Sequence, residues 1–156
     1  IKNDGGKIKM KNKLILGAVM GAILISATGC DEGRTLTCTN EADEEGAKLS
    51  QQVIVSFDKK ENISHVKVTS VVEAEDDYAD EMDDYEEMVK ETIDGNDEEH
   101  LKMSYKRNGN TLSQVTEYYV NQMSEEEKEN NGFDDPDENS YDALKENFED
   151  QGYTCK

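Results

Sequence analysis

The sequence has few of the residues, and none of the short motifs, from which the commonest catalytic and metal sites are recognised. It contains no tryptophan and only two histidines, His65 and His100, which are few for acid–base chemistry. It lacks a Cys-x-x-Cys pair, a His-Glu-x-x-His zinc motif, a glycine-rich phosphate loop and a Gly-x-Ser-x-Gly nucleophile motif. We therefore expect a protein that is not an enzyme and that holds no cofactor.

Basic residues are also scarce relative to acidic ones. The chain has 17 Lys and Arg against 37 Asp and Glu, a net charge of −20. Five of the lysines and one aspartate precede Cys30, so the remainder carries 12 basic and 36 acidic residues, a net charge of −24. Such a surface repels phosphate backbones and anionic lipid headgroups. We therefore expect no nucleic-acid partner and no membrane affinity from the protein surface itself.

The chain has no hydrophobic run as long as the roughly 20 residues that span a bilayer. Its longest apolar run covers residues 14–25, follows a lysine-rich start and ends in small residues before Cys30. This order is typical of a secretory signal peptide. A cysteine directly after Ala27-Thr28-Gly29 resembles the lipobox of bacterial lipoproteins, which usually has Leu where this chain has Ala27.

The lipobox resemblance implies that residues 10–29 are a signal peptide and that Cys30 carries a diacylglyceryl group. Two acyl chains give stable membrane anchoring, and residues 30–34 would be a short tether. An uncleaved transmembrane anchor and an ordinary secretory signal are the alternatives. We expect residues 1–9 to be translated upstream sequence, because Met10 followed by Lys-Asn-Lys is the more typical protein start.

The chain has only three cysteines, and they are far apart. If Cys30 carries the lipid, Cys38 and Cys155 remain, and an even pair in an exported protein favours a disulfide. Because this bridge would close nearly the whole exported chain, the chain-entropy model gives it about 4–5 kcal/mol of stabilisation. Two buried free thiols are the alternative.

Apolar periodicity predicts one domain over residues 35–156. Residues 76–93 carry a helical stripe of Tyr78, Met82, Tyr85, Val89 and Ile93, with Asp76 or Asp77 as the cap and Gly95 at the end. Residues 40–46 look like an acidic turn, and Asn108-Gly109 is a tight-turn signal. Strands are expected at 35–39, 49–57, 63–72, 101–105 and 111–120. A short helix is expected after Ser124, and a last helix with Ser140 or Asn139 as its cap.

The order of these elements determines the expected fold class. Strands joined by short turns pair antiparallel, and amphipathic helices cover a sheet on its apolar side. We therefore expect an α+β domain, with an antiparallel sheet of about five strands and two amphipathic helices packed on one face. In residues 63–72 the apolar positions change parity, which a β-bulge would reconcile.

One stretch partly matches a calcium-binding loop. Oxygen-bearing residues occupy positions 1, 3, 5, 7 and 12 of such a loop, namely Asp135, Asp137, Asn139, Tyr141 and Glu146. However, position 6 should be Gly and is Ser140, and position 8 should be apolar and is Asp142. Because chance matches are expected in so acidic a chain, we predict an acidic loop that caps the last helix, with calcium binding as the alternative.

Several motifs together resemble the YehR-like small lipoproteins, surface lipoproteins of Gram-positive bacteria whose function is unknown. These motifs are the lipobox, Leu36-Thr37-Cys38-Thr39, Phe57-Asp58-Lys59 and the terminal Gly152-Tyr153-Thr154-Cys155-Lys156. The resemblance implies lipid anchoring on the extracellular face of the cytoplasmic membrane, an α+β fold and the cysteine pair. It implies no active site.

These observations predict a non-enzymatic binding or structural domain held at the membrane. Its partner would be an envelope protein, a peptide or another envelope component. The alternative, suggested by the charge of −24, is a lipoprotein that binds divalent cations with low affinity.

Overall fold

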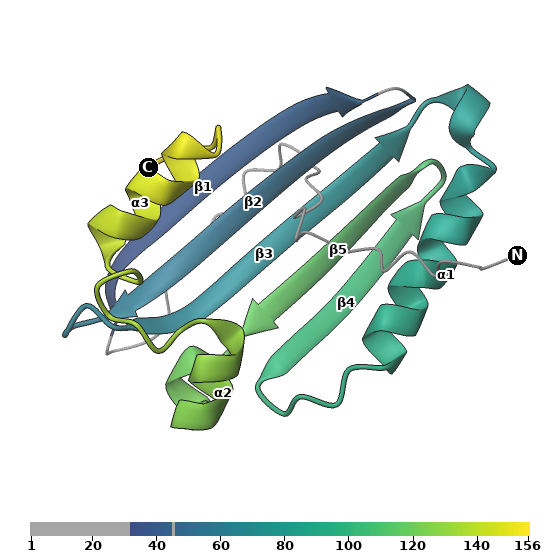
Figure 1. Ribbon diagram of the computed structural model, residues 1–156. Helices are drawn as coiled ribbons and strands as arrows, with labels where there is room; N and C mark the ends of the chain where they lie inside the picture. Colours follow the sequence, from purple (N-terminus) through teal and green to yellow (C-terminus); the bar gives the residue numbers. More distant parts are fainter. Residues whose placement is uncertain (1–31, 45) are drawn as a thin grey trace, which may run out of the picture.

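The structure, a computed structural model, describes residues 32–156 with the exception of residue 45. One antiparallel sheet has the strand order β4-β5-β3-β2-β1-β6 (Figure 1). The strands are β1 (Glu32–Glu44), β2 (Ala47–Asp58), β3 (Ile63–Ala74), β4 (Leu101–Asn108), β5 (Thr111–Tyr118) and β6 (Thr154–Cys155). The helices are η1 (Asp76–Tyr78), α1 (Glu81–Asp94), η2 (Val120–Gln122), α2 (Glu125–Asn131) and α3 (Tyr141–Asp150). The predicted α+β class is confirmed, with six strands where about five were expected.

The helices pack on one face of the sheet, in two apolar clusters. One cluster joins α3 and the segment around α2 to Val53 of β2 and Val68 of β3. The other joins α1 to Leu49 of β2 and Val72 of β3. Because these strand residues are an even number of positions apart, their side chains lie on the same face of the sheet. The predicted one-sided arrangement is therefore confirmed.

The first strand is longer than predicted. β1 runs through residues 40–44, which pair with β2 as far as Glu44 opposite Ala47, so the predicted turn at residues 40–46 was wrong. At this end β1 is the outer strand of the sheet, because β6 pairs only with Cys38 and Thr39. Acidic side chains at an outer strand stay in water, so they do not prevent strand pairing.

The predicted bulge lies at the end of the β2–β3 hairpin. The register shifts between Ser56 and Phe57, which brings Phe57 opposite Ile63. Ile63 and Val66 are an odd number of positions apart, and the bulge between them lets both contact the same apolar cluster. Val71 is also buried but lies on the opposite face, opposite Ser50.

Helix α1 is shorter than the predicted helix at residues 76–93. The stripe packs as predicted, with Met82 and Val89 buried in the second cluster. The predicted start was wrong, because Asp76 lies in η1 and the N-cap residue of α1, Asp80, makes no side-chain cap. The ring of Tyr78 in η1 packs directly on Gly46. A Cβ atom at position 46 would clash with this ring, so the contact requires glycine.

The C-terminal part closes the domain. Ser140 caps α3 by accepting a hydrogen bond from the backbone N–H of Ala143 at 3.3 Å. After α3 the chain turns at Gly152 with φ +89° and adds β6 to β1. Cys38 and Cys155 lie opposite each other in this pairing and are joined as a disulfide, with a Cα–Cα distance of 4.1 Å.

Three predictions concern segments that the structure does not describe. The signal peptide at residues 10–29, the upstream segment 1–9 and the lipidated Cys30 all lie outside the described residues. In the part that the structure describes, no helix is long and apolar enough to cross a membrane.

Candidate functional site

The candidate site is a cleft of about 490 Å³ at one end of the sheet. Four segments line it: the tip of the β2–β3 hairpin (residues 58–64), η2, α2, and the loop between α2 and α3. We call it the acidic cleft and define it by its carboxylates Asp58, Glu61, Glu125 and Asp134. Its volume lies in the range of small-ligand sites, about 300–1,000 Å³.

Apolar side chains from three of these segments also line the cleft. They are Ile63 of β3, Val120 of η2, which is 2% exposed, and Phe133 of the loop. The ring of Phe133 packs edge-on against Tyr118, with the ring centroids 5.5 Å apart. The apolar lining is therefore continuous with the core and is fixed in place by it.

The β2–β3 turn is organised around the carboxylate of Asp58. Its Oδ1 accepts hydrogen bonds from the backbone N–H groups of Lys60 at 2.7 Å and Asn62 at 2.9 Å. Burial opposes ionisation of this carboxyl, but the hydrogen bonds from Asn62 and Lys60 outweigh it and lower the pKa of Asp58. Asp58 therefore keeps its negative charge at neutral pH.

The wall contributed by α2 is held by a capping box. Oγ of Ser124 accepts a hydrogen bond from the backbone N–H of Glu127 at 3.2 Å, and the Glu127 carboxylate accepts one from the backbone N–H of Ser124 at 2.6 Å. This cap fixes the first turn of α2, which carries Glu125. One turn on, Nζ of Lys128 lies 2.8 Å from Oε1 of Glu125.

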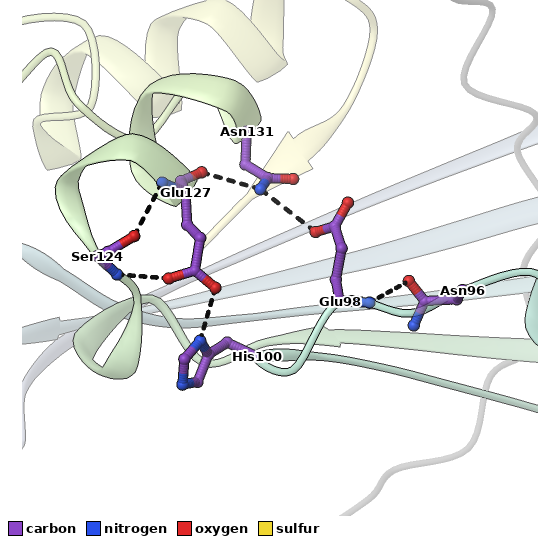
Figure 2. A network of polar contacts seen from close by, with 6 residues as sticks. All are labelled: Asn96, Glu98, His100, Ser124, Glu127 and Asn131. Carbon is purple, nitrogen blue, oxygen red and sulfur yellow. Dashed lines mark hydrogen bonds and ion pairs between the residues drawn. The ribbon is translucent and has the colours of Figure 1, made fainter.

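A polar network ties α2 to the segment before β4 (Figure 2). Nδ1 of His100 lies 2.9 Å from Oε1 of Glu127, and Nδ2 of Asn131 donates to Oε2 of Glu98 at 3.4 Å (Figure 2). The pKa of Glu127 is lowered to about 2. The largest cause is the hydrogen bond from the backbone N–H of Ser124, and the next is the hydrogen bond with His100. The network positions α2, and with it one wall of the acidic cleft.

In the loop that partly matches a calcium site, the first oxygen ligand of the pattern is used within the loop itself. Oδ1 of Asp135 accepts from the backbone N–H groups of Asp137 at 2.9 Å and Glu138 at 3.2 Å. The Asn139 amide donates to the Gly132 carbonyl at 3.0 Å. The Tyr141 ring packs against Phe57, with the centroids 5.7 Å apart.

Glu146, the last residue of the calcium pattern, lies exposed on α3. Throughout residues 32–156, residue 45 apart, no three His, Cys, Asp or Glu side chains are placed to hold a metal ion. The geometry of this loop therefore gives the calcium alternative no support.

A second cavity, of about 430 Å³, lies beside the outer strand β4. Its charged lining residues are Lys102 and Glu117, and Ile93 and Met103 are among the others. One cation and one carboxylate leave this cavity without a net charge that would select a ligand. The acidic cleft is therefore the stronger candidate.

No family model, no curated protein and no solved structure matches the chain. The resemblance to the YehR-like lipoproteins is therefore still a prediction, and the site is argued from its geometry alone.

The sequence did not predict the acidic cleft. Its lining residues come from segments as far apart as Asp58 and Asn139, and no single sequence motif contains more than one of its carboxylates. The nearest signal was the acidic loop, since Asn139 of the calcium pattern lines the cleft with its neighbours Asp134 and Pro136. The predicted residues Asp135, Asp137, Tyr141 and Glu146 are not among the lining residues.

Proposed function

We propose that this protein is a lipid-anchored binding domain on the outer face of the cytoplasmic membrane of a Gram-positive bacterium, with the acidic cleft as its binding site. A diacylglyceryl group on Cys30 holds it there. Binding, rather than catalysis, is the role that a cleft with apolar lining and no nucleophile–base pair suits.

The observation that carries the proposal is the composition of the cleft. Apolar side chains that are part of the core lie beside amides and carboxylates, which gives both contact area and polar selectivity. The disulfide between β1 and β6 supports an extracellular location, because such bonds persist in oxidising compartments.

Site-specific photo-crosslinking in living cells tests this function. A benzophenone side chain replaces Asn121, which is exposed in the cleft, and in the control replaces Glu87, which is exposed on α1. We expect a defined covalent adduct with an envelope component from position 121 and none from position 87. The same adducts from both positions, or none from position 121, would contradict the proposal.

A further inference from the structure

The lining of the acidic cleft carries a net negative charge of its own. Four carboxylates line it, against one ammonium group, that of Lys128. The exported chain around it has a net charge of −24, from 12 basic and 36 acidic residues after the first 29. The local and the long-range fields therefore have the same sign, and both attract a cation.

Three of these carboxylates have an ionic or hydrogen-bonding partner, and the fourth has none. Glu61 lies 3.0 Å from the guanidinium of Arg34, and Glu125 lies 2.8 Å from Lys128. The carboxylate oxygens of Asp58 accept hydrogen bonds within their own turn. Among the contacts of the described residues, the side chain of Asp134 makes none, so its charge is available to a ligand.

The rest of the lining shows what kind of cation fits. Three side-chain amides, those of Asn62, Asn121 and Asn139, line the cleft and offer carbonyl oxygens to N–H donors. The apolar side chains suit a hydrocarbon chain, because long cationic side chains place their methylene groups on apolar surface and their charge in a polar region. A bare metal ion does not fit, since no three ligating side chains converge in the described part of the chain.

We propose that the acidic cleft binds a primary alkylammonium group, such as a lysine-type side chain of a peptide. Its ammonium group pairs with Asp134, and its methylene chain lies against the half-buried side chains of Ile63 and Phe133. This inference rests on the proposed binding function and adds the chemical class of the ligand. Lys128, the one ammonium group among the lining residues, disfavours such a ligand by its like charge.

The test measures the dissociation constant of Nα-acetyl-lysine methylamide by titration at low salt, with the Nε-acetylated compound as the neutral control. Asp134→Asn keeps the shape of the side chain and should weaken binding by about three- to tenfold, the range of a charge-assisted hydrogen bond at an exposed site. Lys128→Gln should tighten binding about threefold, since it removes a like charge from the lining and leaves Glu125 without its ion pair.

The matched control is Asp137→Asn, which removes the same charge from the same loop without touching the cleft. We expect it to change the dissociation constant by less than about twofold, because exposed charges are screened. Equal weakening by Asp134→Asn and Asp137→Asn, or equal binding of the acetylated compound, would overturn the inference. The absence of any binding would also overturn the inference. If the crosslink from position 121 were still seen, the binding function would stand and only the proposed ligand class would be wrong.

Discussion

His65 lies in an environment that favours its neutral form. It is on the sheet face opposite the helices, with its ring centroid 5.1 Å from that of Tyr119 and Nε2 3.6 Å from the Glu117 carboxylate. Burial lowers the pKa of His65, and this effect, aided by Lys67, outweighs the opposing effect of Glu117. The ion pair with Glu117 is therefore too weak to keep this histidine charged at neutral pH.

This lowered pKa predicts how stability responds to acid. Below the ordinary histidine pKa the unfolded chain binds a proton that the folded chain still excludes, so the free energy of unfolding falls as the pH falls through the folded pKa. Between about pH 7.5 and about pH 5.5, we expect His65→Gln to lose less stability than the wild type in urea titrations. Parallel losses in the two proteins would contradict this account of His65.

Ser124 caps α2 beside the cleft, and the loss of this cap should be measurable. Ser124→Ala removes the acceptor for the Glu127 N–H and should lower the free energy of unfolding by about 1 kcal/mol. Ser104→Ala, at an exposed position of β4, is the control and should change it by less than about 0.5 kcal/mol. Chemical denaturation of both variants measures the difference, and equal losses would show that the cap does not stabilise the fold.

At the scale of elements, the last strand is short, and a covalent bond reinforces its few non-covalent contacts. β6 has two residues and pairs with Cys38 and Thr39, with further backbone hydrogen bonds between Lys156 and Thr37. The ring of Tyr153 packs against Phe148 of α3, and its hydroxyl donates to the buried Gln51. The disulfide between Cys38 and Cys155 therefore secures both β6 and α3.

Removing this bridge should have a large effect on stability. The two cysteines are 117 positions apart, and for such a loop the chain-entropy model gives about 4–5 kcal/mol. The double variant Cys38→Ser/Cys155→Ser should lose that amount in denaturant titrations, and reduced wild type should lose the same. Two free thiols in the exported protein, or no difference between oxidised and reduced wild type, would contradict the assignment.

Most of the elements could be predicted from the sequence, because their signals are local. The alternation around Val53, the helical stripe from Met82 to Ile93 and the capping box at Ser124 each depend on neighbouring residues. The full length of β1 could not be predicted, since its last residues are acidic and become a strand only by pairing with β2. Strand pairing depends on residues far apart in the sequence, so it cannot be predicted from local propensity.

At the scale of the whole molecule, charge and anchoring have to be considered together. A chain with 36 acidic residues after position 29 cannot be held at an anionic membrane by its surface. The described residues include no helix able to cross a bilayer. If Cys30 carries the proposed lipid, we expect that lipid to supply the membrane affinity that the acidic surface lacks.

Cys30→Ser tests the anchor. We expect the protein to move from the membrane fraction to the culture medium, because a single acyl chain is already marginal for anchoring and this variant has none. Cys38→Ser is the control for the loss of a cysteine and should stay in the membrane fraction. Retention of Cys30→Ser at the membrane would favour an uncleaved anchor instead.

The acidic cleft is also a property of the whole molecule, which is why the sequence did not predict it. The β2–β3 turn supplies Asp58, and the loop after α2 supplies Asp134, which is more than seventy residues later in the chain. In a chain so rich in carboxylates, neither residue stands out by type or spacing. Only the folded sheet brings them together beside Phe133 and leaves Asp134 without a partner.

The central claim, that the acidic cleft binds an alkylammonium group, is tested most directly by mapping where such a group binds. Nuclear magnetic resonance of the chain carrying Cys30→Ser, titrated with Nα-acetyl-lysine methylamide, reports on each residue separately. We predict that the largest shifts fall on the side-chain amides of Asn62, Asn121 and Asn139 and on the Phe133 ring. Shifts spread over the acidic face of α1, or shifts equal to those caused by the acetylated compound, would contradict the claim.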